Sequence, residues 1–222
     1  MQNKHFRILF CVALLLITAT ASANNAKKMA QINKRADSRY ECKENMRNLY
    51  LALTNYADLN DGKLPVKDNL GGLKELLPYG VSPENFYCPY YKGEKYKNKD
   101  EKKKNKKSSK KDVFTEKNSA YIYFGGINLK SSKNKVPKMI VMCDKFFDTT
   151  SGHLRVLLVD GNILELKTGK IEISGKNEKL KKLVDLIDYL AKTYKYPQDV
   201  YRALRNKAEK MDTEFKLTVQ KN

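Results

Sequence analysis

The residues that could carry out catalysis are few in this chain of 222 residues, and the pair that invites a mechanism lies in its second half. His153 is the one histidine beyond the N-terminal segment, so imidazole chemistry would have to use it. Cys143 could act as a nucleophile with His153 as its base, because an adjacent base activates a weak nucleophile. The chain has no Gly-x-Ser-x-Gly elbow and no recognisable oxyanion hole. We therefore favour a structural role for His153 and predict no catalytic residue.

Metal and cofactor chemistry has equally little support. Two histidines and four cysteines are too few for a multi-histidine site or for most zinc-finger patterns. The segment 58–62 contains two aspartates, an asparagine and a glycine, but it lacks the alternating spacing and the terminal glutamate of an EF-hand. The glycine pairs at 71–72 and 125–126 lack the spacing of a phosphate-binding loop. We predict a protein that is not an enzyme and that uses neither a metal nor a cofactor.

The net charge of +19 indicates attraction to polyanions such as nucleic acid, anionic lipid or acidic surface polymers. Lysines are densest in residues 92–112, a segment with no aliphatic side chain and with Tyr96 as its one aromatic residue. Such a segment cannot bury enough apolar surface to offset its ordering entropy, so we predict a solvated loop. The candidate polyanion-binding residues are Lys102, Lys103, Lys104, Lys106, Lys107, Lys110 and Lys111.

The partner of this lysine-rich segment would be an anionic surface polymer rather than a nucleic acid. Proteins that bind single strands alternate basic residues with aromatic residues on which bases stack. Residues 92–112 have no such alternation and no arginine. Polyanion binding through this segment is the alternative function that the sequence supports, and an expanded insertion loop without a ligand is the simpler interpretation.

The N-terminal segment has the three-part layout of a secretory signal peptide. Lys4 and Arg7 precede an apolar run that starts at Ile8, and small residues occupy 21–23. The run is shorter than the roughly 20 residues that an α-helix needs to cross a bilayer. We predict that residues 1–23 are a signal peptide and that the mature protein is extracytoplasmic, either periplasmic or secreted. The alternative is a retained membrane anchor.

Export would place the cysteines of the chain in an oxidising compartment, where disulfides persist. Three cysteines remain beyond the signal segment: Cys42, Cys88 and Cys143. At most one intramolecular bridge can form among three, and the third thiol is then buried, reactive or paired to another chain. The sequence leaves all three pairings open, together with the alternative that every one is a small buried hydrophobic residue.

The first half of the mature chain is predicted to be mainly helical. Apolar residues recur every three or four positions along residues 27–59, which favours one long helix that ends near Gly62. Residues 70–79 suggest a short helix stopped by Pro78. Residues 86–89 should follow as an extended piece.

The second half is predicted to form an antiparallel sheet of three or four strands. Strand-forming runs cover residues 119–126, 138–143, 154–159 and 162–166. The pair Asp160 and Gly161 between the last two runs predicts a hairpin with a type I′ turn, in which both residues have positive φ. Residues 170–173 could extend the same sheet.

The C-terminal part returns to the helical period. Apolar residues spaced by three or four predict amphipathic helices over 180–194 and 200–215, separated by Pro197. Together they suggest a helical hairpin. Their apolar stripes, which include Ile187 and Leu204, are a candidate contact surface for a partner as well as a candidate core.

Five short segments follow one another in the middle of the chain. They are residues 42–49, 56–65, 86–89, 121–126, and 143–145 with His153 leading to 156–161. Their order resembles that of bacterial prepilin-like proteins related to the pseudopilins of type II secretion, whose domain ends in a hairpin with a His…Asp-Gly motif. The motif positions here are His153, Asp160 and Gly161.

The resemblance implies an α+β fold in which a long N-terminal helix packs on a small antiparallel sheet, over residues 24–175, with a helical extension at 176–222. It implies a Cys42–Cys88 disulfide. It also implies protein partners in a pilus-like or secretion-linked extracytoplasmic assembly. Family members usually begin with a Gly-Phe-Thr-Leu-Ile-Glu processing site, which this chain lacks. We therefore expect an exported, non-enzymatic assembly partner that meets a membrane only if its N-terminal segment is retained.

Overall fold

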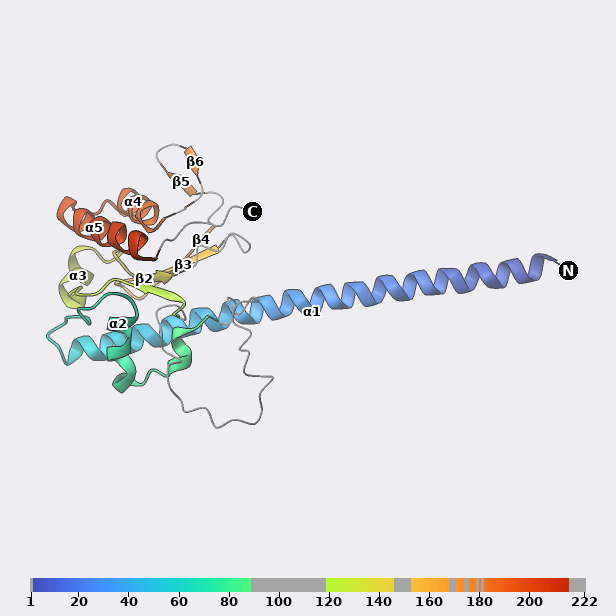
Figure 1. The fold of residues 1–222 in the computed structure, drawn as a ribbon, viewed down its shortest axis with the longest axis horizontal. Coiled ribbons are helices and arrows are strands. Elements are labelled where there is room, and N and C mark those ends of the chain that lie inside the picture. The colour runs from blue at the N-terminus through green and yellow to red at the C-terminus, as the bar shows by residue number, and fades with distance from the viewer. Residues whose placement is uncertain are drawn as a thin grey trace. The chain divides into compact units, whose positions relative to one another are not determined.

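The computed structural model describes residues 2–88, 119–145, 153–167, 171–173, 176–178, 180 and 182–215, and Figure 1 shows their secondary structure. The lysine-rich segment 92–112, with every candidate polyanion-binding lysine, lies outside the described residues. The chain divides into one unit from Met1 to Glu41 and a second, compact unit from Cys42 to Asn222. No helix in the described part of the chain has both the length and the apolarity needed to cross a membrane.

The helix α1 (Gln2–Asp58) enters the compact unit at Cys42. From there its buried side chains recur every three or four residues and form one face: Cys42, Met46, Leu49, Leu53 and Ala57. The helix ends where the amide of Gly62 donates to the carbonyl of Ala57, at 2.8 Å. This confirms the predicted end of the helix in the 58–62 segment.

Three short helical segments follow: α2 (Asn69–Leu73) and two 3-10 helices, η1 (Lys74–Tyr79) and η2 (Pro83–Phe86). The prediction that Pro78 stops a single helix is wrong, because η1 continues through Pro78 and ends at Gly80 in the left-handed conformation. A 3-10 helix accommodates the fixed φ of proline. The predicted extended piece begins at Tyr87, since Phe86 still belongs to η2.

The predicted antiparallel sheet is confirmed and has four strands in sequential order. They are β1 (Tyr121–Tyr123), β2 (Ile140–Asp144), β3 (His153–Leu158) and β4 (Ile163–Lys167), with α3 (Leu129–Lys135) between the first two. The suggestion that residues 170–173 extend this sheet is wrong. Instead, β5 (Ile171–Ile173) pairs with β6 (Lys176–Glu178) as a separate ribbon, because its hydrogen bonds are satisfied by the residues that follow immediately.

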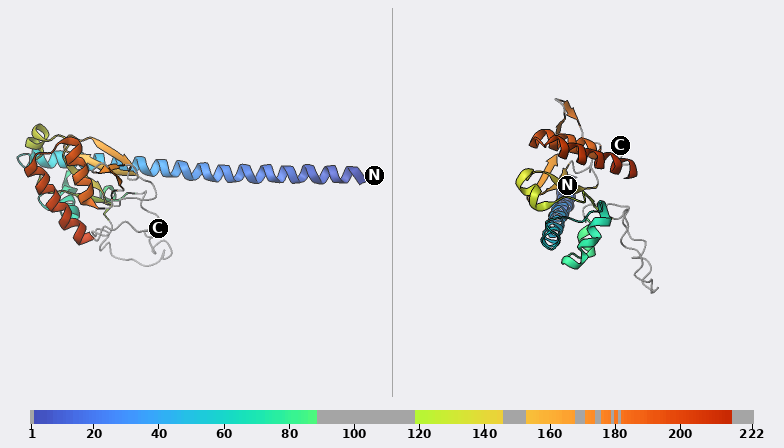
Figure 2. Two further views of the ribbon diagram at one scale, coloured as in Figure 1. Left: turned by 90° about the horizontal axis from the view of Figure 1, so that it is seen from above. Right: turned by 90° about the vertical axis from the view of Figure 1, so that its left-hand side faces the viewer.

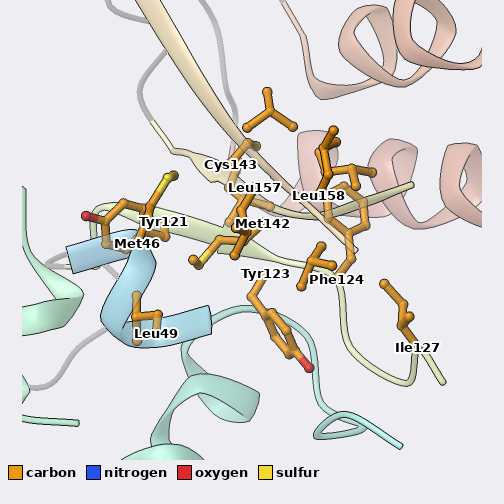
Figure 3. Packing of buried hydrophobic residues seen from close by; sticks show 14 of the residues in the cluster. Met46, Leu49, Tyr121, Tyr123, Phe124, Ile127, Met142, Cys143, Leu157 and Leu158 are labelled. Atoms are coloured by element: carbon orange, nitrogen blue, oxygen red, sulfur yellow. The ribbon is translucent and has the colours of Figure 1, made fainter. Parts of the chain in front are cut away.

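The two faces of the four-stranded sheet are covered by different helices. Tyr121, Tyr123 and Met142 lie on the face toward α1, where Met46 and Leu49 pack (Figure 3). The opposite face carries Ile122, Cys143 and Val156, which the strand register places side by side. This second face is covered by α4 (Leu183–Tyr194) and α5 (Gln198–Phe215), as Figure 2 shows.

The helices α4 and α5 pack against each other, which confirms the predicted helical hairpin. Ile187 and Leu204 are both buried in the hydrophobic core, so they are not available to a partner in this fold. The carboxylate of Asp212, in α5, accepts the amides of Leu183 at 2.9 Å and Val184 at 3.1 Å. A residue of one helix therefore caps the N-terminus of the other.

Candidate functional site

A disulfide joins Cys42 on α1 to Cys88, just beyond η2, with their Cα atoms 5.0 Å apart. Both cysteines are buried. This is the pairing that the family resemblance implies, and the structure confirms it. The bridge fixes the start of the packed part of α1 to the segment that precedes the undescribed residues 89–118.

Hydrogen bonds reinforce the same place. The hydroxyl of Tyr121 donates to the carbonyl of Cys42 at 3.2 Å, which ties β1 to α1. The side-chain amide of Asn45 donates to the carbonyl of Tyr87 at 2.8 Å, and that of Asn85 donates to Asn45 Oδ1 at 3.0 Å. The disulfide is therefore one of several links that hold α1 to β1 and to residues 85–88.

Buried charges gather beside this bridge. The strand register places Asp144 opposite Arg155, and their side chains are 0% and 5% exposed. The amide of Arg155 donates to Asp144 Oδ2 at 2.9 Å, and its Nη1 lies 3.6 Å from Asp144 Oδ1. The same Nη1 donates to Cys88 Sγ at 3.9 Å. The guanidinium thus lies between a carboxylate and a disulfide sulfur.

Arg155 was not among the residues predicted for a site, although the sequence contains a signal for it. An arginine between Leu154 and Val156, in the middle of an apolar strand, is out of pattern for a strand that is buried on both faces. Such a residue needs an anionic partner, and Asp144 at the end of the preceding strand supplies it.

Cys143 is a free, buried cysteine on the face toward α4 and α5. Burial raises the pKa of its thiol well above the usual value, and the carboxylates of Asp144 and Asp212 raise it further. Cys143 is paired with Val156, and His153 lies three residues before Val156, so the side chains of Cys143 and His153 point to opposite faces of the sheet. The structure does not bring the two together as a nucleophile and its base.

The Asp160–Gly161 turn closes the β3–β4 hairpin, as predicted, but it is not a type I′ turn. Gly161 has a φ of 85°, whereas Asp160 is not among the described residues with positive φ. The amide of Gly161 donates to the carbonyl of Leu158, and the amide of Leu158 donates to that of Asn162, both at 2.9 Å. This pattern is a three-residue connection in which glycine takes the left-handed position of a bulge.

The side chain of Asp160 is held by three hydrogen bonds. Lys138 Nζ donates to it at 2.7 Å, and Asn162 donates through its backbone amide at 3.0 Å and its side-chain amide at 2.7 Å. Burial raises the pKa of the Asp160 carboxyl, but the hydrogen bonds from Lys138 and Asn162 outweigh it and leave the pKa below its usual value. Asp160 therefore acts as an ionised anchor for the turn.

Gly161 lets the turn approach α1 closely. A Cβ atom at this position would lie 2.6 Å from Cε1 of Tyr50, which no side chain tolerates without movement. The hydroxyl of Tyr50 donates to the carbonyl of Val159 at 2.9 Å. One family-motif position, Gly161, thus lies directly against α1, and the bond from Tyr50 to Val159 fastens the hairpin there.

His153, the third motif position, lies at the opposite end of β3. A strand rises about 3.4 Å per residue, so His153 is more than roughly 15 Å from the Asp160–Gly161 turn. The motif therefore does not converge on one site. Among the described residues, no group of three or more His, Cys, Asp or Glu side chains is arranged to hold a metal ion.

Comparison of the chain with protein-family models, with curated proteins and with solved structures finds no match. Function must therefore be argued from the chain's own geometry. That geometry contains one place where covalent, ionic and hydrogen-bonded links meet, around Cys42, Cys88 and Arg155.

Proposed function

We propose that this chain is an exported, non-enzymatic, pseudopilin-like protein that serves as a component or partner of a secretion-related, pilus-related or other cell-surface assembly. The observation that carries the proposal is the difference between the two parts of α1. From Cys42 onward this helix is fastened to the sheet, whereas its preceding residues belong to a separate unit and expose apolar side chains. The disulfide agrees with an oxidising compartment.

The exposed apolar side chains before Cys42 form what we call the α1 stripe: Met29, Ile32 and Tyr40, which are 56%, 48% and 66% exposed. At about 100° per residue, the three lie within a sector of roughly 80° on the helix surface. A helix face of this kind is suited to packing against another helix. The α1 stripe is thus a candidate contact surface, and unlike Ile187 it is not part of the core.

Charging the α1 stripe tests the assembly role. The triple variant Met29→Glu, Ile32→Glu and Tyr40→Glu should move the protein, in its own cells, from a cross-linkable complex to the monomer fraction. The thermal transition of the compact unit should not change, since the stripe lies outside that unit. The variant Gln31→Glu, on another face of the same helix, is the control. A triple variant that stays in the complex would contradict the proposal.

The mature N-terminus tests the released form of the protein. We expect intact mass and N-terminal sequencing of the native protein to give a start at Asn24 in the extracytoplasmic fraction. A retained N-terminal segment in the membrane fraction would instead support the anchored alternative. Either result decides which cellular fraction should be searched for partners.

Polyanion binding is the second candidate function, favoured by the net charge of +19 and by exposed lysines on α3, namely Lys130, Lys133 and Lys135. Deleting residues 92–112 should weaken retention on a heparin column and reduce its dependence on salt. A deletion variant that elutes at the same salt concentration as the parent would show that this segment does not bind polyanions.

A further inference from the structure

The buried charges of the described residues are confined to one place. Three charged side chains are buried there: Asp144 at the end of β2, Lys145 directly after it, and Arg155 on the paired strand β3. A buried charge is costly unless it is paired. A cluster of buried charges therefore marks a candidate functional place. The disulfide is the chemically distinctive group at that place, and Arg155 contacts it through the sulfur of Cys88.

The contact makes the two sulfurs of the bridge unequal. A guanidinium next to a sulfur stabilises the thiolate form of that cysteine. In thiol–disulfide exchange, the sulfur that forms the more stable thiolate is the better leaving group. An attacking thiolate is therefore directed to Cys42, and the bond breaks toward Cys88.

We propose that the Cys42–Cys88 bridge is a redox-responsive link, in which Arg155 receives Cys88 as the leaving thiolate when a dithiol reductant attacks Cys42. One thiolate of the reductant bonds to Cys42 Sγ, the bond between Cys42 and Cys88 breaks, and its electron pair passes to Cys88. The second thiol of the reductant then attacks the mixed disulfide and releases Cys42. The bridge gains two electrons and two protons, and the dithiol becomes a disulfide.

Cys42 is buried, so the attack requires a local opening. Its position makes such an opening the least costly within the packed part of α1, because Cys42 is the first residue of the compact unit and the described residues just before it are largely exposed. Such an opening would break the hydrogen bond from the Tyr121 hydroxyl to the Cys42 carbonyl. Reduction would then loosen the first turn of the packed part of α1. The inference that this loosening regulates assembly rests on the function proposed for α1.

The site of attack can be measured directly. The mature protein is incubated with reduced glutathione under native conditions, quenched with acid, and mapped by peptide mass spectrometry. We expect the mixed disulfide on Cys42. An adduct found mainly on Cys88 overturns the proposal, whatever the outcome for the α1 stripe, because this readout does not depend on assembly.

A set of variants tests the role of Arg155. The double variant Arg155→Gln with Asp144→Asn removes both buried charges together, so that neither is left unpaired. We expect it to be reduced by dithiothreitol about tenfold more slowly, as expected for the loss of an opposite charge beside the leaving sulfur. Arg155→Lys should retain most of the rate. Lys43→Gln, which removes a partly exposed cation that is next to Cys42 in the chain and pairs with Glu165, is the control and should leave the rate unchanged.

An unchanged reduction rate in the double variant, with its thermal transition intact, would overturn the role of Arg155. If the double variant does not fold, the position of the glutathione adduct in the parent protein and in Arg155→Lys decides the question. In both proteins the adduct should lie on Cys42.

Discussion

On the face of the sheet covered by α1, a disulfide accompanies the packing, whereas on the mainly aliphatic face covered by α4 and α5 the links between described residues are all non-covalent. The α1 side has a disulfide, tyrosine hydroxyls that donate to backbone carbonyls, and a buried ion pair. The other side has buried leucines and isoleucines, and a free cysteine. It also has polar links: the Tyr196 hydroxyl donates to the Lys138 carbonyl at 2.6 Å, and Lys207 Nζ donates to the Gly125 carbonyl at 2.8 Å. Apolar burial supplies stability without fixing direction, while bonds of defined geometry set the position of a helix. We infer that the disulfide is what distinguishes the attachment of α1, because hydrogen bonds and an ion pair position α4 and α5 as well.

The largest effect is expected from a charge placed on the aliphatic side. Ile187→Asp would bury an unpaired carboxylate in the core, at a cost of more than about 4 kcal/mol. We expect the cooperative thermal transition to disappear, as followed by circular dichroism. Lys192→Asp, on the exposed side of the same helix, should melt close to the parent. If Ile187→Asp melts normally and loses a partner, then α4 is a binding surface rather than a core element.

Removal of the disulfide should have the next largest effect. Cys42→Ala with Cys88→Ala frees a loop with a sequence separation of 46 and should cost about 2–5 kcal/mol in urea unfolding. Cys143→Ala, on the other face, removes only a small buried side chain and should cost roughly 1 kcal/mol. Equal losses from the two changes would mean that the bridge contributes no more than ordinary packing.

A comparison of two glycines isolates the contact between the hairpin turn and α1. Both Gly161 and Gly80 have positive φ, but only Gly161 has an atom within 4 Å of the site of an added Cβ, namely the ring of Tyr50. Gly80→Ala should cost about 1 kcal/mol from backbone conformation alone. Gly161→Ala should cost about 1–2 kcal/mol more, because the ring must move. Matching losses in thermal unfolding would show that the turn does not need its close approach to Tyr50.

The smallest effect concerns pH, and its sign differs between two aspartates. The pKa of Asp160 lies below the ordinary value of about 3.9, so the stability it contributes is present above that pH and is lost as the pH falls. Burial raises the pKa of Asp212, against the hydrogen bonds from Leu183 and Val184. Its contribution is therefore present below pH 3.9 or so and is lost as the pH rises through its folded pKa.

These signs can be read from two variants. When the pH is lowered from about 7 to about 3, Asp160→Asn should gain stability relative to the parent. Over the same change Asp212→Asn should lose stability relative to the parent, each by about 1 kcal/mol or less. Thermal melts at several pH values provide the measurement. Relative changes of the same sign in both variants would contradict the assignment.

The elements that could be predicted from the sequence are those with a strong local signal. The period of three and four gave the packed part of α1 and the pair α4 and α5, and the run of strand formers around Asp160 and Gly161 gave the hairpin. The turn type was wrong because the loop has three residues, so only glycine needs positive φ. The continuation of η1 through Pro78 was missed, since the usual rule applies to α-helices.

The candidate site was predictable only in part. The residues alone left three disulfide pairings open, and the choice of Cys42 with Cys88 came from the family resemblance. The ion pair of Asp144 and Arg155 depends on strand register, which a sequence specifies only through pairing. His153 and Asp160 are far apart because β3 runs between them. That separation depends on where the strand begins and ends, which the sequence specifies only loosely.

The disulfide closes its loop before the undescribed segment 89–118, and Cys143 is free. The described residues thus contain no covalent link, apart from the backbone itself, between the fragment carrying α1 and the fragment carrying every strand. One backbone cut between residues 88 and 119 would turn the packing of Met46 and Leu49 against the sheet into an interface between two polypeptides. The compact unit could then be reconstituted by fragment complementation from two separately produced chains.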